Sequence, residues 1–463
     1  MSRLFVRDRS FYKTVFLLAL PVVLQNMITI GVNMLDTIML GTYGETQLSG
    51  ASLANEFISL HQILCLGIGG GAAVLTSQYW GAKDIPAMRR VIVLMLRISM
   101  VLGAVLAAAV LVAPEFIMSI YADEQPVIEA GAIYFRISAP TFLLTGLITP
   151  VTVVLRSTRQ VKLPLIASII SFGCNLVLNY LLIFGHLGLP EMQIAGAALA
   201  TVIARVIEAT IVMVYLLRID ERIGLRLRHF RDKVSDMIRP YFRYSVPVIV
   251  SDFLLGLGNT AVSVVIGHMG ENFTAANAIV AQTVRLSTVA NQGISNAGGV
   301  MTGNTLGKGD RDKAYREAVT FLCLSVLMGL LAAVIILSVC PLVLSAYDLQ
   351  PETLQIARQL MYSVSLMVVF QATQSMLTKG ILRNGGDTRF LMVADIAFMW
   401  LASIPLGALA AYVWGMSAFW INFLLRIDYI IKTVWCTIRM TKKKWMHGVA
   451  AKLKDTDPAP AKA

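Results

Sequence analysis

Long apolar runs alternate with short polar turns from the beginning of the chain to its end. Each run is at least about as long as the ~20 residues that an α-helix needs to cross the ~30 Å hydrocarbon core of a bilayer. The pattern predicts an all-α integral membrane protein with about twelve transmembrane helices. The predicted helices are residues 14–41, 49–79, 91–113, 129–155, 163–184, 193–218, 241–267, 274–306, 315–340, 353–382, 389–412 and 415–440.

The composition supports this prediction. Hydrophobic residues make up 57% of the 463 positions and charged residues 14%. A soluble domain of this composition would leave large apolar patches in water. The basic start is typical of a signal peptide, but the apolar run after it is too long and lacks a cleavage motif, so we expect an uncleaved first helix. The five cysteines lie singly in apolar runs, and we interpret them as packing residues.

Basic residues are confined to alternate turns. The turns after odd-numbered helices contain no Lys or Arg. Because Lys and Arg concentrate in cytoplasmic loops, this asymmetry predicts a multi-pass protein of the cytoplasmic membrane with both termini in the cytoplasm. The net charge of +12 is then a topology signal, and we expect the lipid bilayer rather than a nucleic acid as its partner. The turns after even-numbered helices contain Lys83, Arg89, Arg90, Arg156, Arg159, Lys162, several Arg within 222–239, Lys308, Arg311, Lys313, Arg383 and Arg389.

The chain also repeats itself. A shift of 226 positions aligns residues 19–90 with 245–316 without a gap, and 14 of the 72 pairs are identical. The matches fall on turn and packing residues, such as Gly81 with Gly307 and Asp84 with Asp310. We therefore predict two six-helix bundles related by a pseudo-two-fold axis along the membrane normal, with a cavity between them. The predicted division is an N-terminal bundle at 1–218, a cytoplasmic linker at 219–240, a C-terminal bundle at 241–440 and a basic cytoplasmic tail at 441–463.

Polar residues recur at helical spacing inside several apolar runs. Such stripes are typical either of a polar cavity wall or of hydrogen bonds that hold helices together. The first helix carries Asn26, Thr29, Asn33 and Asp36, and the fifth carries Asn175 and Asn179. The candidates for a substrate cavity are Asn26, Thr29, Glu56, Asn259, Gln282, Gln371, Gln374 and Asp395.

Acidic residues within the runs are the strongest candidates for ion coupling. Asp36 has no basic neighbour in the sequence. An apolar medium disfavours an isolated charged carboxylate, so a carboxyl group there can take up and release a proton or bind a small cation. We expect coupling at Asp36 with Asn33, Asn175, Asn179 and Asp252, with no metal beyond Na⁺ at Asp36 or Asp252. Asp428 lies next to Arg426 in sequence, and we expect an ion pair or a cytoplasmic contact there rather than coupling.

Several short motifs resemble those of one transporter family along nearly the whole chain. They are Ala19–Pro21, Asp36-Thr-Ile-Met39, Ser77-Gln-Tyr-Trp-Gly-Ala82, residues 175–185 and the turn Leu382-Arg383-Asn384-Gly385-Gly386-Asp387-Thr388-Arg389. The chain is similar in these segments to the multidrug and toxic compound extrusion (MATE) transporters of the multidrug, oligosaccharidyl-lipid and polysaccharide flippase superfamily. The resemblance places an amide, Asn179, where some members carry Asp. Residues 156–160 are a degraded first-half counterpart of the glycine turn.

The resemblance implies an antiporter that exports amphipathic, cationic drugs or metabolites in exchange for H⁺ or Na⁺ by alternating access. It also implies a monomer that works without a cofactor. Within the same superfamily, a lipid-linked precursor flippase is the alternative, but its basic cavity would need a cluster among Arg97, Arg136, Arg205 and Arg285. Scattered histidines and the absence of a P-loop argue against an enzyme or an ATP-driven pump. A plain channel would not explain two differently lined halves.

Overall fold

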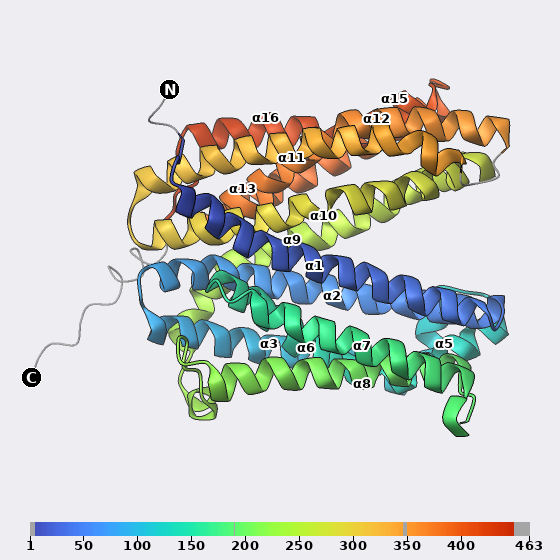
Figure 1. Ribbon diagram of the computed structural model, residues 1–463, viewed down its shortest axis with the longest axis horizontal. Coiled ribbons are helices and arrows are strands. Elements are labelled where there is room, and N and C mark those ends of the chain that lie inside the picture. Colours follow the sequence, from blue (N-terminus) through green and yellow to red (C-terminus); the bar gives the residue numbers. More distant parts are fainter. Residues whose placement is uncertain (1–4, 189, 346–349, 449–463) are drawn as a thin grey trace, which may run out of the picture. The chain divides into compact units, whose positions relative to one another are not determined.

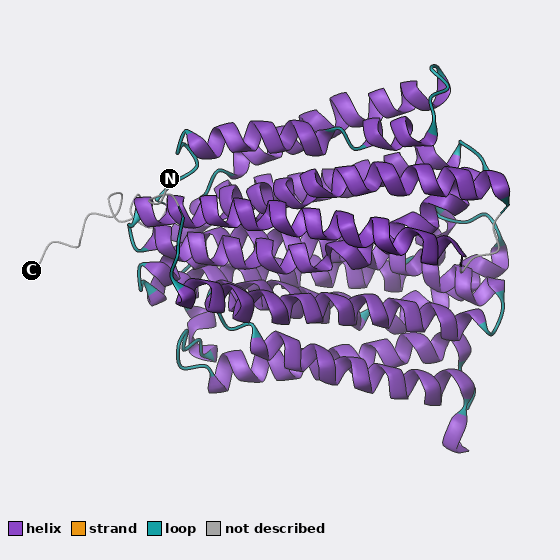
Figure 2. Cartoon of the chain, turned by 45° about the horizontal axis from the view of Figure 1, so that its top comes forward, coloured by secondary structure: helices purple, strands orange, loops and turns teal. Residues whose placement is uncertain are grey.

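The computed structural model describes residues 5–188, 190–345 and 350–448, and these residues form helices and turns without a strand (Figures 1 and 2). The first half contains α1 (Arg9–Gly41), α2 (Glu45–Gly81), α3 (Ile85–Val112), α4 (Pro114–Ser119), α5 (Gln125–Ser138), α6 (Pro140–Ser157), α7 (Lys162–Phe184), the short turn η1 (His186–Gly188), α8 (Gln193–Val214), and the turns η2 (Tyr215–Ile219) and η3 (Leu227–Arg231). The second half contains α9 (Ser235–Gly267), α10 (Glu271–Gly307), α11 (Arg311–Ser345), α12 (Pro351–Ser375), η4 (Met376–Leu382), α13 (Thr388–Ile396), η5 (Ala397–Ser403), α14 (Ile404–Tyr412), α15 (Ala418–Leu425) and α16 (Asp428–Thr441).

These helices lie where the apolar runs predicted them. The predicted helices at 353–382 and 389–412 stay continuous but contain the π-helical turns η4 and η5, and two other predicted helices are broken. The predicted helix at 129–155 is divided into α5 and α6 at Pro140, which has no N–H for the helix ladder. The predicted helix at 415–440 is divided into α15 and α16. In the described part of the chain, ten helices are long and apolar enough to cross a membrane. The all-α, multi-pass fold is therefore confirmed, although α10 is too polar to be counted and α15 and α16 are too short.

In both repeats an aspartate side chain caps the N-terminus of a helix. Asp84 accepts a hydrogen bond from the backbone N–H of Ala87 at 3.2 Å at the start of α3. Its repeat partner Asp310 accepts one from the backbone N–H of Lys313 at 2.9 Å at the start of α11. A carboxylate in this position satisfies N–H groups that the first helical turn leaves unpaired. The aligned aspartates therefore have the same structural role.

The described chain forms two compact units. The first unit comprises residues 1–23, 77–83 and 246–463, and the second comprises 24–76 and 84–245. The boundaries fall inside α1, α2 and α9, so the beginning of the first helix of each half belongs to the unit of the other half. The division predicted from sequence at 218 and 241 stays a prediction.

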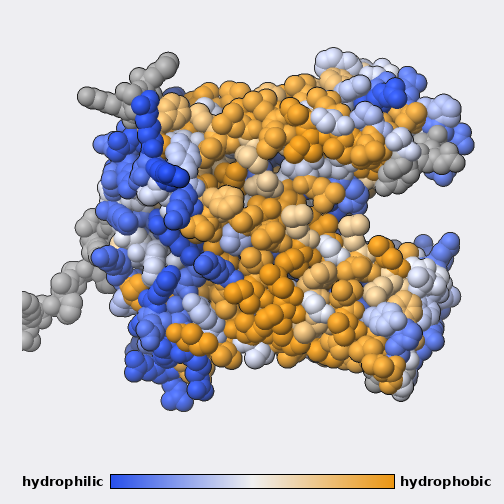
Figure 3. Space-filling model, in the orientation of Figure 1, coloured by the Kyte–Doolittle hydropathy of each residue, from blue (hydrophilic) through white to orange (hydrophobic). Residues whose placement is uncertain are grey.

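Each unit presents apolar side chains on its outside. On α11, for example, Leu327, Leu330, Leu331 and Val334 are exposed. Figure 3 shows apolar residues over the middle of the helices and hydrophilic residues at their ends. Exposure of such an apolar surface to water is unfavourable, whereas lipid chains solvate it.

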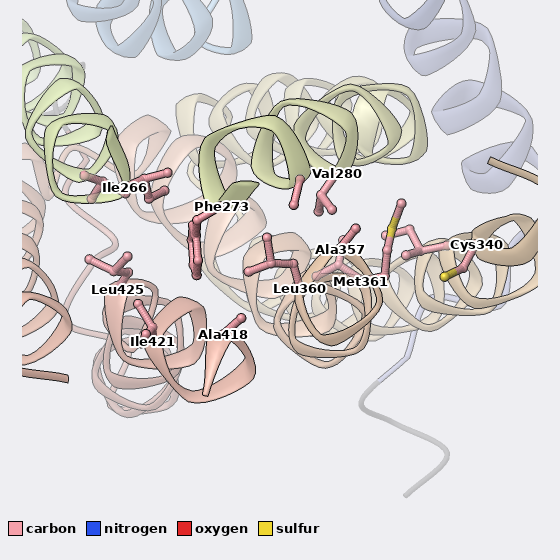
Figure 4. Packing of buried hydrophobic residues seen from close by; sticks show 14 of the residues in the cluster. Ile266, Phe273, Val280, Cys340, Ala357, Leu360, Met361, Ala418, Ile421 and Leu425 are labelled. Carbon is pink, nitrogen blue, oxygen red and sulfur yellow. The ribbon is translucent and has the colours of Figure 1, made fainter. Parts of the chain in front are cut away.

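Inside the first unit, the core lies among α9, α10, α11, α12 and α15. Figure 4 shows Phe273 and Val280 of α10 facing Leu360 and Met361 of α12. Phe273 is 4% exposed and Met361 is fully buried, so these helices bury apolar side chains against one another. A separate core in the second unit lies around Phe135 and Phe142.

Glycines of the repeat allow helices to touch through their backbones. A Cβ on Gly81 would collide with the carbonyl of Asn304, and a Cβ on its partner Gly307 would collide with the carbonyl of Gln78. Gln78 and Asn304 are themselves repeat partners, so the ends of α2 and α10 meet in a quasi-symmetric contact. In the run Gly67–Gly71, Gly69 lies against Pro150 and Gly71 against Ser245, so these glycines also allow close helix packing.

Candidate functional site

Asp36 lies beside the two amides that the sequence singled out. Asn179 of α7 donates a hydrogen bond from Nδ2 to Asp36 Oδ1 of α1 and another to Asn175 Oδ1 at 3.2 Å. Asn175 is 3% exposed and Asn179 is fully buried. The other amide oxygen, Asn179 Oδ1, has no hydrogen-bond partner among the described residues. The cluster therefore combines a carboxylate with two amide oxygens, the hard ligands that small cations prefer.

A second chain of polar contacts lies in the same unit. Arg156 donates to Gln25 Oε1, and Gln25 Nε2 donates to Ser168 Oγ at 3.0 Å. Ser168 donates in turn to Glu208 Oε1 at 3.0 Å, and Arg205 pairs with Glu208 Oε2 at 2.9 Å. Glu208 is thus a buried carboxylate with two strong partners. Asp36, in contrast, forms no ion pair among the described residues, where its side-chain partner is the amide of Asn179.

The remaining candidates of the first half are less closely gathered. Thr29 is exposed and donates to the backbone carbonyl of Gln25 at 3.0 Å, a bond internal to α1. Glu56 on α2 is exposed and Asn26 is half-buried. The side chain of Asn33 lies outside the described residues. Their assignment to a substrate cavity or to ion coupling stays a prediction.

In the second half, Asp252 is paired. Arg383 holds both of its carboxylate oxygens, with Nη2 at 2.7 Å from Oδ1 and Nη1 at 3.0 Å from Oδ2. The first half has a weaker counterpart, because Arg156 reaches the amide of Gln25 on the first helix of its own half. In both halves an arginine from the turn region thus binds the first helix. Ion coupling at Asp252 stays a prediction, and any such role would have to operate with Arg383 in place.

Asp395 belongs to a buried ion cluster that the sequence did not reveal. Lys432 Nζ lies 3.1 Å from Asp395 Oδ1 and 3.0 Å from Asp428 Oδ2, and all three side chains are at most 4% exposed. Asp428 does form an ion pair, but with Lys432 rather than with its sequence neighbour Arg426. Residues 428 and 432 are one turn apart on α16, whereas Arg426 precedes that helix and binds Asn259 at 3.1 Å.

The other second-half candidates differ in environment. Asn259 and Gln282 are exposed, and Asn259 also donates to the backbone carbonyl of Leu255 at 3.0 Å. Gln371 and Gln374 of α12 are half-buried, and Gln374 accepts hydrogen bonds from Thr378. Their role in a cavity stays a prediction.

The signature turn 383–389 anchors the end of the chain. Asp387 accepts hydrogen bonds from Arg439 Nε at 2.6 Å and Nη2 at 3.1 Å. The backbone N–H of His447 donates to the carbonyl of Gly385 at 3.0 Å, and Gly386 has a left-handed φ of 91°. A Cβ on Gly385 would collide with the indole of Trp445, which is fully buried. The turn therefore holds α16 and the segment after it through Asp387 and Gly385.

Replacing Asp387 by Asn is expected to destabilise the protein at neutral pH and to have little effect in acid. Burial disfavours its charged form, but hydrogen bonds from His447 and Arg439 outweigh burial and hold the pKa of Asp387 below the usual 3.8. A lowered carboxyl pKa stabilises the folded state above pH ~4, and this contribution is lost as the pH falls through the folded value. Unfolding of wild type and D387N in detergent between pH 3 and 8 checks this, and a stability difference that does not shrink in acid would contradict it.

The groups that sequence reasoning missed are Glu208, Arg205 as its partner, and Lys432. A signal did exist for the first pair, since an Arg and a Glu three residues apart inside an apolar run would each be costly without the other. Lys432 and Asp428 had the same kind of spacing, four residues apart. Ionisable groups buried in apolar helices are typical of transport proteins.

The fold and these groups define a multi-pass membrane transporter. A family model described as MatE matches the chain twice, at residues 21–181 and 247–409, and the matches begin at the 226-residue offset of the repeat. The chain therefore belongs to this family of multidrug efflux transporters, and the resemblance to MATE transporters is confirmed. The absence of an enzymatic activity stays a prediction.

Curated relatives and solved structures agree along nearly the whole chain. The probable multidrug resistance protein YoeA of Bacillus subtilis is 24% identical over 452 residues, covering 94% of this chain and 96% of the relative. The probable multidrug resistance protein NorM of Thermotoga maritima is 24% identical over 436 residues, covering 94% and 93%. A crystal structure of MATE in the bent conformation superposes with a TM-score of 0.84 at 18% identity, covering 94% of this chain and 96% of that one. This last likeness shows the fold.

Proposed function

We propose that the protein is a secondary antiporter that exports amphipathic, cationic compounds in exchange for H⁺ or Na⁺. The observation that carries this proposal is the cluster of Asp36, Asn175 and Asn179. It offers carboxylate and amide oxygens in a buried place, and the oxygen Asn179 Oδ1 has no donor among the described residues. A proton or a small cation would satisfy these oxygens, and nothing in the cluster requires a cofactor.

The proposed mechanism is alternating access driven by the ion. A ligand shifts a conformational equilibrium only when its affinity differs between the two states. Uptake of a cation at Asp36 would neutralise the carboxylate and change its bond with Asn179, which joins α1 to α7. Substrate and ion would then favour different states and compete.

Topology and location follow from the distribution of charge. We place the protein in the cytoplasmic membrane with both termini in the cytoplasm, since the turns after odd-numbered helices lack Lys and Arg. Its partners would be the bilayer and small-molecule substrates, and we expect a monomer. The charge of the substrate needs a direct test, because one solved transporter of similar fold, from Pyrococcus furiosus with a TM-score of 0.83, is described as having a binding pocket of reverse polarity that suggests a different function.

Efflux of a fluorescent cationic dye from proteoliposomes tests the proposal. Proton and sodium gradients are imposed separately on wild type, on D36N and on D123N, which removes a loop carboxylate instead. We expect gradient-driven efflux in wild type and D123N and a loss of at least about tenfold in D36N. The gradient that drives wild-type efflux identifies the ion.

Two results would overturn parts of the proposal. Efflux that D36N retains would remove Asp36 from coupling. No dye movement under either gradient would exclude a cationic drug substrate and favour the flippase alternative. Three of the arginines that a flippase would gather are engaged separately in the structure, with Arg136 on Glu115, Arg97 on the carbonyl of Phe230 and Arg205 on Glu208.

A further inference from the structure

The ion cluster of the second half, Asp395, Asp428 and Lys432, is closed around the lysine. Each of the four carboxylate oxygens has a partner. Asp395 Oδ1 and Asp428 Oδ2 face the Lys432 ammonium at 3.1 and 3.0 Å. Asp395 Oδ2 accepts a hydrogen bond from Ser251 Oγ at 2.6 Å, and Asp428 Oδ1 accepts one from Ser403 Oγ at 2.9 Å. Two carboxylates, each supported by a serine hydroxyl on its other oxygen, thus face one monovalent cation.

Local helix geometry brings these groups together. Asp395 and Ser403 are eight residues apart, and in a regular α-helix such residues point about 80° apart. The π-helical turn η5 lies between them and takes up one extra residue, which reduces the difference to about 20°. Pro405 follows at the start of α14 and lacks the N–H that a regular turn would use. The widened turn therefore places Asp395 and Ser403 on the same side, toward α16.

The Asp36 cluster of the first half also contains buried oxygen ligands, but in the described part of the chain they are not paired with a Lys or Arg. Asn179 Oδ1 lacks a partner among the described residues, and no Lys or Arg there pairs with Asp36. The second-half cluster has hard oxygen ligands as well, but its centre is filled by a group of the protein itself. Burial of the two carboxylates is compensated by the ion pairs with Lys432 and by the two serine hydrogen bonds.

We infer that Lys432 is a tethered cation that occupies an alkali-ion position between Asp395 and Asp428, and that it thereby confines exchange of the coupling ion to the first half. This inference rests on the proposed antiport for its consequence, but the site itself can be tested by cation binding without transport. Removal of the ammonium would leave two buried carboxylates facing the vacated position, and hard oxygens of this kind bind Li⁺, Na⁺ or K⁺.

The test measures thermal unfolding of purified protein while LiCl, NaCl or KCl is titrated at constant ionic strength with choline chloride. The background is D36N, which silences the proposed first-half site. A ligand that binds only the folded state raises the unfolding temperature with the logarithm of its concentration. In D36N we expect the alkali ions to leave the unfolding temperature unchanged. In D36N/K432Q we expect at least one of them to raise it, and we expect that rise to be lost when D428N is added. K432R, which keeps a tethered cation, is the matched control and should behave like D36N alone.

Two results would overturn the inference. One is a folded D36N/K432Q protein that none of the three ions stabilises. The other is an unfolding temperature that rises with an alkali ion in D36N and no longer rises when D395N or D428N is added. This result can be obtained even if K432Q does not fold. Failure of the proposed antiport would be visible separately, as a wild-type protein whose dye efflux neither a proton nor a sodium gradient drives.

Discussion

Replacing Arg383 by Met is expected to destabilise the protein by about 3–5 kcal/mol, the typical cost of breaking a buried ion pair. Arg383 and Asp252 are 13% and 15% exposed, and the guanidinium binds both oxygens of the carboxylate. Met fills much of the volume of the Arg side chain but leaves Asp252 charged and unpaired. Reversible unfolding in mixed detergent micelles measures the loss.

A double variant separates the cost of an unpaired charge from the cost of lost packing. Adding D252N to R383M removes the orphaned carboxylate, so we expect the double variant to recover more than half of the loss. D252N alone should also be destabilised, because it leaves the arginine without its counter-charge. Additive effects of the two substitutions would contradict the pairing, since residues in one ion pair are expected to be coupled.

The positions of the helices could be predicted from sequence because lipid imposes them. Each span must satisfy its own backbone hydrogen bonds and present apolar side chains, and both requirements leave a local pattern. The repeat was equally visible, since Asp84 and Asp310 cap corresponding helices and Gly81 and Gly307 form one backbone contact. Local geometry fixed the residue type at these positions.

The side-chain partners could not be predicted in the same way. Lys432 and Asp395 lie 37 positions apart in the chain (432 − 395), and their meeting depends on a π-helical turn that no residue pattern announces. Asp36 and Asn179 are 143 positions apart and were grouped by residue type and by resemblance. Sequence could therefore name candidates, but only the packed helices show which acids are already neutralised by a neighbour.

The acids of the two halves differ in their partners. An acid with a fixed cationic partner, such as Asp252 or Asp395, contributes to the folded scaffold. An acid held only by amides, such as Asp36, can gain and lose a cation without breaking an ion pair. Under the proposed antiport, the first half would therefore be the half that exchanges the ion, whereas Asp252, Asp395 and Asp428 of the second half are held in ion pairs.

Replacing Trp445 by Ala is expected to cost about 3–5 kcal/mol in stability, the usual range for removing a buried Trp side chain. Trp445 is fully buried, its Nε1 donates to the carbonyl of Met440 at 3.2 Å, and its ring lies against Gly385 in the signature turn. The substitution would leave a cavity at the point where the segment after α16 meets that turn. Unfolding of W445A, compared with W435A as a control in which an exposed Trp is removed, checks this. Equal losses in the two variants would show that the segment does not anchor on the turn. A loss confined to W445A, together with a coupling energy between W445A and D387N in a double-mutant cycle, would establish the anchor.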